Sequence, residues 1–368
     1  MPINIDGSKG IRQNTTEVTK IPVGTTAQRP ANPEAGMMRF NTDERQVEGY
    51  NDSLDEWQPM NQLFQKLAAT GGTVTDIIQD GQLFRVHAFT SDGTFEVTAG
   101  GGEVEYLIVG GGGSGSSRYS GGGGAGGLIL GSTTLSPGAF SVTVGAGGTR
   151  NDNTGTSAEN TLGDPGQDSS AFGNTAIGGG AGLPADLSDG KADQNGGSGG
   201  GGGNGGRALN PGSGIPGQGN DGGIGSDRID GGGGYCGGGG GAGQKGEGAT
   251  PNDGPGKGGD GINLSETFGN SFGDNGFFAG GGGGGGHDPT PTALHGTRLP
   301  GGAGGGGDSG IISPNDSSTT ITNNTGSDGL DGQVNTGGGA GGPTTNTGSG
   351  GVAGNGGSGI VLIRYRIG

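Results

Sequence analysis

The chain is poor in the residues that fill ordinary protein cores. Only 26% of its 368 residues are hydrophobic and 5% are aromatic, so side-chain packing cannot fill a core along the whole length. One cysteine, Cys236, excludes an intramolecular disulfide, and we expect it to be a small apolar residue rather than a reactive thiol. No apolar run approaches the ~20 residues of a membrane helix, and the first residues lack a signal-peptide pattern. We therefore expect no membrane insertion.

Basic and catalytic residues are also scarce. The chain has 18 Lys and Arg against 35 Asp and Glu, for a net charge of −17. A nucleic-acid partner would require a basic face, so we expect none. Three histidines leave little for general acid–base catalysis, and the spacing assembles no nucleophile, base and orienting group. We predict a protein that is not an enzyme and that needs no cofactor.

Glycine, in contrast, is abundant. The chain has 104 glycines and 17 prolines, a composition typical of disordered, low-complexity chains. The glycine runs, however, begin after the strand-like residues 104–109 and stop at Gly359, just before the strand-like residues 360–363. Glycine enclosed between two apolar strands favours a folded region over a flexible one. Hydrogen exchange would decide between the two, since a disordered run shows no amide protection.

A physical mechanism for such a fold exists. Glycine can adopt an extended threefold helix that resembles polyproline II and rises about 3.1 Å per residue. Glycine keeps its N–H, so these helices can hydrogen-bond side by side. Runs such as Gly280–Gly286 are therefore predicted to be polyglycine II rods, and the polar segments of variable length between runs are predicted to be loops at the ends of the rods.

Three zones differ in their sequence texture. Residues 1–60 indicate a small β module, with two short strands joined by a polar turn and Trp57 covering one face. Residues 61–81 are interpreted as a connector with a helical turn or two. Residues 82–368 are predicted to form a β-sandwich-like domain with inserted polyglycine II helices joined by loops. The fold class is thus mainly β, with few or no α-helices.

Strand patterns within residues 82–368 are of two kinds. Residues 84–89 and 140–144 alternate in polarity, as half-buried strands do, whereas residues 104–109 and 360–363 are nearly continuous apolar runs, as central strands are. We expect the last strand, residues 360–367, to pair into the sheet of the strands near residues 84–144 and so to close the domain.

Glycine runs also create chance motifs. The many G-x-G-x-x-G strings lack the strand-to-helix context of a nucleotide site. Gly222–Asp230 matches one calcium-binding β-roll repeat, but the next nonapeptide has Cys236 in place of the aspartate, and ion binding there stays open. His287 and His295 share one segment that supplies no further ligands at metal-site spacing. No metal site is predicted.

Four phenylalanines cluster just before the longest glycine run: Phe268, Phe272, Phe277 and Phe278. In a chain with so few core residues, aromatic rings are readily used for burial. They also make good recognition anchors. The sequence leaves both interpretations open.

Two stretches resemble known phage proteins. The first resembles a short module that recurs in bacteriophage tail-fibre and virion structural proteins, particularly of marine and cyanobacterial phages, and consists of residues 24–30, 36–43 and 47–50 with Trp57. The second resembles the glycine-rich domain of similar phage proteins, through residues 86–90, 93–95, 104–113 and 359–365.

The resemblance implies a virion fibre or spike that is attached by its N-terminus and exposes a glycine-rich head. Some phage adhesins stack glycine runs as polyglycine II helices and contact the host with the loops between them. The implied partners are two further copies in a homotrimer, other virion proteins at the N-terminal module, and a host-surface glycan or outer-membrane protein. The implied location is the particle surface, after assembly in the host cytoplasm.

Candidate residues follow from these expectations. Candidate receptor contacts, chosen by their position in loops, are Arg118, Tyr119, Phe272, Phe277, His287, His295 and Arg298. Candidates for N-terminal anchoring and oligomerisation are Phe40, Tyr50 and Trp57.

Three alternatives remain. A capsid or tail decoration protein would have the same head without a receptor role. A polysaccharide-degrading tailspike would show a long β-helix with β-branched ladders, which the chain lacks. An ice-binding protein would show a regular G-x-x repeat, and the chain has no such repeat along its length.

Overall fold

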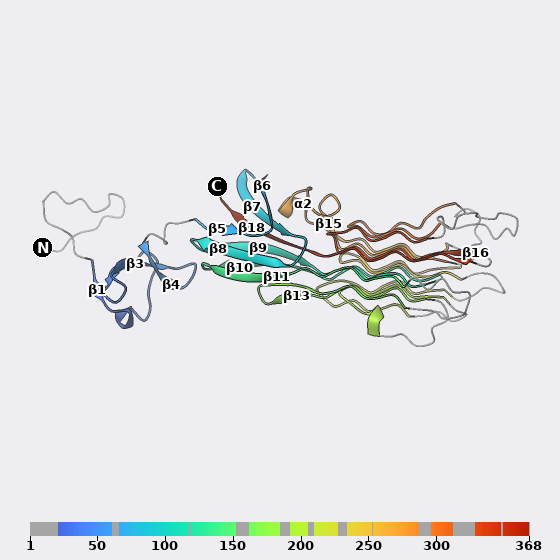
Figure 1. The fold of residues 1–368 in the computed structure, drawn as a ribbon, viewed down its shortest axis with the longest axis horizontal. Helices are drawn as coiled ribbons and strands as arrows, with labels where there is room; N and C mark the ends of the chain where they lie inside the picture. The colour runs from blue at the N-terminus through green and yellow to red at the C-terminus, as the bar shows by residue number, and fades with distance from the viewer. Residues whose placement is uncertain are drawn as a thin grey trace.

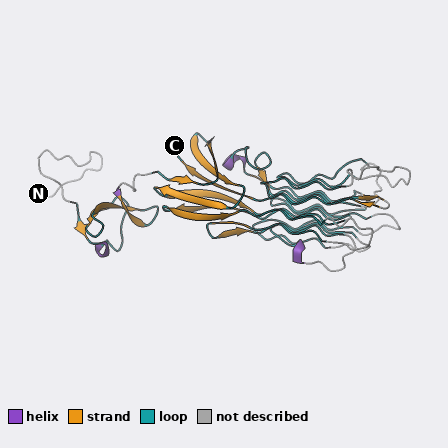
Figure 2. Cartoon of the chain, viewed as in Figure 1, coloured by secondary structure: helices purple, strands orange, loops and turns teal. Residues whose placement is uncertain are grey.

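The computed structural model is elongated, with three parts in a row (Figure 1). A small N-terminal sheet is followed by a β-sandwich, and a bundle of extended glycine-rich segments extends from the sandwich. Most of the bundle has no regular secondary structure in Figure 2, although its segments run side by side. The structure describes residues 21–60, 66–117, 119–151, 162–184, 192–204, 210–226, 234–251, 253–286, 296–311, 328–346 and 349–367.

The N-terminal sheet has the strand order β1-β2-β3-β4. Its strands are β1 (Val23–Gly24), β2 (Met38–Asn41), β3 (Gln46–Asn51) and β4 (Glu56–Pro59), with the short 3-10 helix η1 (Thr26–Gln28) after β1. The polar turn between β2 and β3 forms as predicted, and Trp57 lies within β4 itself, directly opposite Tyr50 of β3.

Two five-stranded sheets make the sandwich. One has the order β10-β9-β18-β7-β6 and the other β13-β12-β11-β8-β5. Their strands are β5 (Ala68–Thr70), β6 (Thr73–Gln79), β7 (Gln82–Phe89), β8 (Gly93–Ala99), β9 (Gly102–Val109), β10 (Leu128–Leu135), β11 (Gly138–Thr143), β12 (Ser169–Ala171), β13 (Asn174–Ala176) and β18 (Ile360–Arg366).

The two apolar runs are central neighbours in the first sheet. β18 pairs with β9 on one side and with β7 on the other, so the prediction that the last strand closes the domain is confirmed. Apolar side chains pack on both faces of this sheet. One core fills the space between the sheets around Phe95 and Ile363, and the other lies on the outer face around Leu362 and Phe268.

Two expectations need correction. Residues 66–81, the described part of the predicted connector, contain β5 and β6, which form edges of the two sheets; β-branched residues such as those of Thr73–Gln79 favour strands over a linker. β7 is not simply half-buried, because residues 86–89 are buried on both of its faces.

His87 lies in this doubly buried part of β7 and is 0% exposed. Its Nδ1 lies 2.7 Å from the carbonyl oxygen of Gly71, so this nitrogen carries the proton of the neutral ring. Its ring stacks on Tyr365 and meets the edge of Phe95. Burial lowers the pKa of His87 below its ordinary value of 6.5, and the nearby Arg85 adds to this effect, whereas the hydrogen bond to Gly71 and the charge of Asp76 oppose it.

We expect the free energy of unfolding to fall as the pH drops below about 6.5. The unfolded chain then binds a proton that the folded chain binds only at lower pH, so the contribution of His87 is complete above that value. His87→Phe should flatten the dependence of the free energy of unfolding on pH below about pH 6.5, as measured by denaturant unfolding at each pH. An unchanged slope in the variant would assign the effect to other groups.

The bundle consists of rods, by which we mean its extended glycine-rich segments. In the rod at residues 121–127, backbone N–H groups donate to three different neighbours in turn. Gly121, Gly124 and Gly127 donate, at 2.7–2.9 Å, to the single rod at residues 177–183. A repeat of three residues per neighbour is the geometry of a threefold helix. The prediction of polyglycine II rods is confirmed by these bonds.

This rod is surrounded on all sides. It donates to residues 177–183, 237–240 and 337–340, and it accepts from residues 110–113, residues 198–201 and Gly282. Six neighbours correspond to hexagonal packing, and the order of the bonded residues makes residues 237–240 parallel to this rod and the other five neighbours antiparallel to it. The longest run, Gly280–Gly286, is a second interior rod that bonds to residues 304–307, 256–259 and 120–123.

Side chains are excluded from the interior rods by neighbouring carbonyl groups. A Cβ on Gly122, Gly123 or Gly126 would lie under 3.0 Å from the backbone of an adjacent rod, which real Cβ atoms essentially never do. Peripheral rods are less constrained. In residues 162–168 and 328–334, glycine occupies every third position, at the face turned toward the bundle.

Aspartate side chains close the edge of this packing. Each accepts a hydrogen bond from a backbone N–H that has no rod beside it to accept one. Such pairs are Asp168 with Gly178, Asp221 with Gly214, Asp260 with Ala303, Asp308 with Gly301, Asp328 with Val352, and Asp331 with Asn355. These carboxylates take the place of missing neighbours, and they account for part of the acidic composition.

The remaining elements are short. They are the 3-10 helix η2 (Ala192–Gln194), the hairpin of β14 (Ile262–Asn263) and β15 (Phe277–Phe278), the four-residue helix α2 (Ser265–Phe268), and the hairpin of β16 (Thr345–Asn346) and β17 (Ser349–Gly350). The fold is therefore mainly β with little helix, as the sequence predicts.

Candidate functional site

The rods connect at two ends of the bundle. The near end lies against the sandwich, where Figure 1 shows α2 and β15, and the far end is marked by β16. The far end of the rods lies away from both the sandwich and the N-terminal sheet. The far end is accordingly the candidate functional site.

Two predicted contact residues border the far end. Tyr119 is half-buried and precedes Ser120, which forms an isolated antiparallel β-bridge with Pro184. Arg298 uses one guanidinium nitrogen, Nη1, to donate to the carbonyl oxygens of Ser309 and Asp328. Arg298 therefore connects the ends of two rods, and these hydrogen bonds fix the position of its guanidinium group. Arg118, His287 and His295 lie outside the described residues.

Phe272 and Phe277 lie elsewhere. They belong to the near end, beside α2 and β15 (Figure 1). Phe268 and Phe278 of the same cluster are 0% exposed, and Phe272 packs against the core that they form on the sandwich. Of burial and recognition, the two interpretations of this cluster, burial is the one that fits Phe268 and Phe278. The structure does not bring Phe272 and Phe277 together with Tyr119 or Arg298.

The three N-terminal candidates lie on two different faces of their sheet. Tyr50 and Trp57 face each other across β3 and β4, with ring centroids 5.8 Å apart. Phe40 pairs with Val47 and points to the opposite face. The structure thus separates residues that the sequence grouped.

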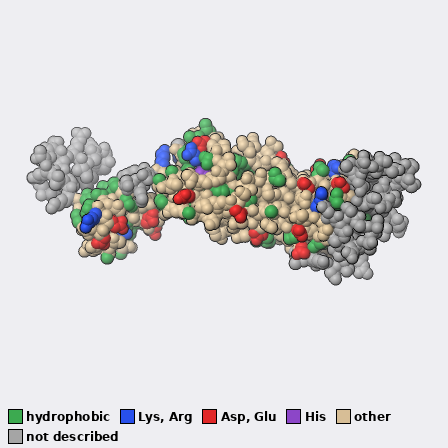
Figure 3. Space-filling view, viewed as in Figure 1, with side chains coloured by type: hydrophobic (Ala, Val, Ile, Leu, Met, Phe, Trp, Pro, Cys, Tyr) green, Lys and Arg blue, Asp and Glu red, His purple; other side chains and the backbone are tan. Residues whose placement is uncertain are grey.

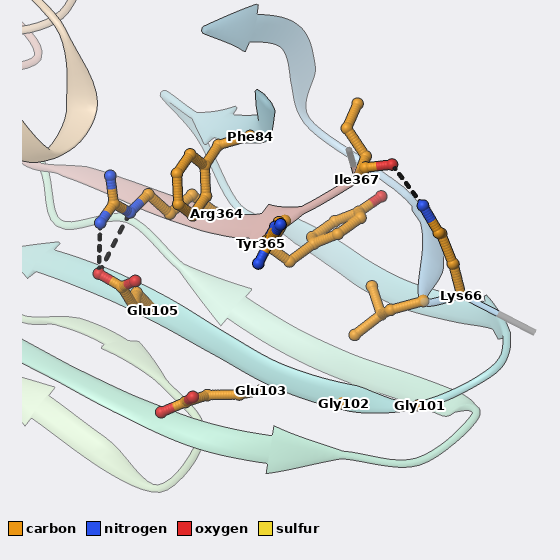
Figure 4. Close-up of a pocket in the computed structure, with 11 residues that line it drawn as sticks. Lys66, Phe84, Gly101, Gly102, Glu103, Glu105, Arg364, Tyr365 and Ile367 are labelled. Carbon is orange, nitrogen blue, oxygen red and sulfur yellow. Dashed lines mark hydrogen bonds and ion pairs between the residues drawn. The ribbon is translucent and has the colours of Figure 1, made fainter. Parts of the chain in front are cut away.

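A pocket that the sequence did not predict lies beside the start of β9 and the end of β18 (Figure 4). It has a volume of about 610 Å³ and combines two aromatic rings, those of Phe84 and Tyr365, with acidic and basic side chains. It is lined by Lys66, Leu67, Phe84, Gly101, Gly102, Glu103, Glu105, Arg364, Tyr365, Arg366 and Ile367. In the sequence, the charged residues Arg364 and Arg366 at the end of the last strand were the available indication of this pocket.

Arg364 occupies the wall of this pocket and is fully engaged. Its Nη2 lies 2.7 Å from a carboxylate oxygen of Glu105, and its guanidinium carbon lies 4.4 Å from the centre of the Phe84 ring. Further hydrogen bonds reach Gln79 and the backbone of Thr267. These contacts clamp the end of β18 to β9, β6 and α2, a structural role.

Cys236 is buried among the glycine rods, and burial raises the pKa of its thiol well above the ordinary value. Gly222 and Gly225 of the calcium-repeat match abut neighbouring rods, which explains these glycines by packing; residues 227–230 lie outside the described part. In that part, no three His, Cys, Asp or Glu side chains gather as a metal site, and no helix is long and apolar enough to span a membrane.

Comparison with known proteins identifies a family. No curated protein matches the chain. A family described as a glycine-rich domain matches residues 90–366, which include the sandwich from the end of β7 onward, the bundle, and β18. Since this match covers well over half of the residues, the chain belongs to the glycine-rich domain family.

Proposed function

We propose that the protein is a structural fibre or spike of a bacteriophage virion, whose N-terminal module attaches it to the particle and whose glycine-rich head faces outward. One observation carries the proposal. The N-terminal sheet and the far end of the bundle lie at opposite ends of one elongated molecule (Figure 1). Such an arrangement separates an attachment end from a presenting end.

The rods suit this role because they fix the far end without specifying its loops. Each rod is held by backbone hydrogen bonds to its neighbours, so a loop can change in length or sequence while the rods keep their packing. Variable loops on an unchanging frame suit contact with a host-surface glycan or outer-membrane protein. The attribution to a phage rests on the sequence resemblance described above.

Competition with phage adsorption tests the receptor role. We expect the purified protein to slow adsorption of the phage to its host. Replacing residues 312–327, which connect two rods, by a Gly-Ser segment of equal length should reduce this competition. Asp80→Gly, in the β6–β7 turn of the sandwich, serves as the control, since Asp80 already has a positive φ of 48° that glycine adopts freely.

The second candidate is a decoration protein with no receptor role. It is favoured by the edge aspartates, which make the exposed bundle acidic and complete its hydrogen bonds independently of the loop sequences. Immunogold electron microscopy that places the protein on the particle, together with no competition in the adsorption assay, would establish this alternative. Absence of the protein from purified particles would overturn both candidates.

A further inference from the structure

The N-terminal sheet carries charge on its covered face and apolar side chains on its open face. Strand register assigns the faces, since paired residues point the same way. Arg39 pairs with Glu48, and Phe40 pairs with Val47. We call the first the ion-pair face and the second the apolar face.

The ion-pair face is closed within the module. Glu48 is 1% exposed, although it carries a carboxylate. It accepts a hydrogen bond from Arg29 at 2.6 Å and one from Asn41 at 3.0 Å, and the Nε of Arg39 lies 3.4 Å from it. A buried ion pair of this kind contributes little net stability, because desolvation offsets the attraction. The module therefore gains little from its own interior.

The apolar face is open to solvent on the side of β1 and β2, whereas Gln58 of β4 on the same face is buried. Val23 is 66% exposed and Met38 is 44% exposed, and Phe40 and Val47 beside them are half-buried. Figure 3 shows hydrophobic side chains gathered on this module. While these side chains stay in water, the small sheet does not gain the stabilisation that their burial would give.

The rest of the apolar face is nearly uncharged. Register places Gly49, Asn51 and Gln58 on it, and Glu56 is its one carboxylate. Glu56 lies at the edge toward the sandwich, where it accepts hydrogen bonds from Gln58 and Ser136. In a chain with a net charge of −17, an apolar and almost neutral surface is an exception.

We propose that the apolar face of Val23, Met38, Phe40 and Val47 is the contact surface between copies of this chain. Copies of an acidic protein repel one another, so a self-contact must exclude the acidic side chains. When two copies meet through the same neutral face, neither copy brings acidic side chains into the contact. A basic partner, in contrast, would be recognised by carboxylates, which this face lacks apart from its corner.

This inference deepens the proposed assembly of the fibre by naming its surface, but its test concerns only mass in solution. The full-length protein should show, by light scattering after size exclusion, a multiple of the 35.2 kDa chain mass. Val23→Glu and Met38→Glu should weaken assembly at least about 100-fold, because like charges then meet in the contact. Val334→Glu is the matched control, since Val334 is 65% exposed on the bundle.

Two results would overturn the proposal. One is a wild-type mass of 35.2 kDa at every concentration, and the other is assembly that both face variants leave intact. Met38→Leu should preserve assembly, and the fluorescence of Trp57 on the opposite face should report that the module is folded in each variant. The virion role can stand in either case, because particle microscopy tests it separately.

Discussion

Deleting residues 360–368 is expected to abolish the folded sandwich. β18 is hydrogen-bonded on both sides, and Ile360, Val361, Leu362 and Ile363 are at most 2% exposed. Burial of each such side chain stabilises the fold by roughly 1.5–3 kcal/mol, so their sum is a large share of the about 5–15 kcal/mol that holds a typical domain together. Soluble yield, circular dichroism and protease resistance would measure the loss.

A point substitution gives the same test without truncation. Leu362→Asp would place a carboxylate where the side chain is 0% exposed, and burying an unpaired charge is strongly unfavourable. Val334→Asp, on the surface of the bundle, should change the unfolding midpoint little. A truncated protein that stays folded and protease-resistant would show that β18 is dispensable.

The second large effect is expected from adding one methyl group inside the bundle. In Gly123→Ala the new Cβ would meet the carbonyl group of Gly113. Neither rod can move away, because each is bonded to other rods. We expect a loss at or above the about 1–3 kcal/mol typical of overpacking, measured by thermal or denaturant unfolding.

Gly138→Ala is the matched control, because the nearest atoms to its new Cβ are 3.9 Å away. At this open position in β11 the substitution should be neutral or should stabilise by about 0.5–1 kcal/mol, as alanine restricts the unfolded chain. Equal effects of the two substitutions would contradict hexagonal packing of the rods.

Much of the fold follows from sequence because its signals are local. The apolar runs at residues 104–109 and 360–363 indicate central strands, and enclosure of the glycine region between them indicates that it is folded. Strand β6 was missed because Thr73–Gln79 lies between the turn residues 71–72 and 80–81, and because its apolar residues do not alternate with polar ones along the sequence. The repeat of glycine at every third position was also missed. Interior rods consist almost entirely of glycine and so show no repeat, whereas peripheral rods such as residues 328–334 do show it.

The candidate site is less predictable, since it depends on which residues share a face or an end. Adjacent positions in sequence gave no indication that Phe40 and Tyr50 point in opposite directions, or that Phe277 and Arg298 lie at opposite ends of the bundle. The anchored state of Arg298 depends on carbonyl groups of Ser309 and Asp328, which a one-dimensional pattern does not bring together.

The orientation of the rods has a mechanical consequence. The rods run along the long axis of the molecule (Figure 1), and their hydrogen bonds lie across it. A pull on a far-end loop therefore loads many of these bonds in shear at once, rather than opening them one after another. The rods at residues 110–113 and 351–359 continue directly into β9 and β18, so tension passes from the tip into the two most buried strands. A load on the far end of the bundle is thus carried along the chain into the core of the sandwich.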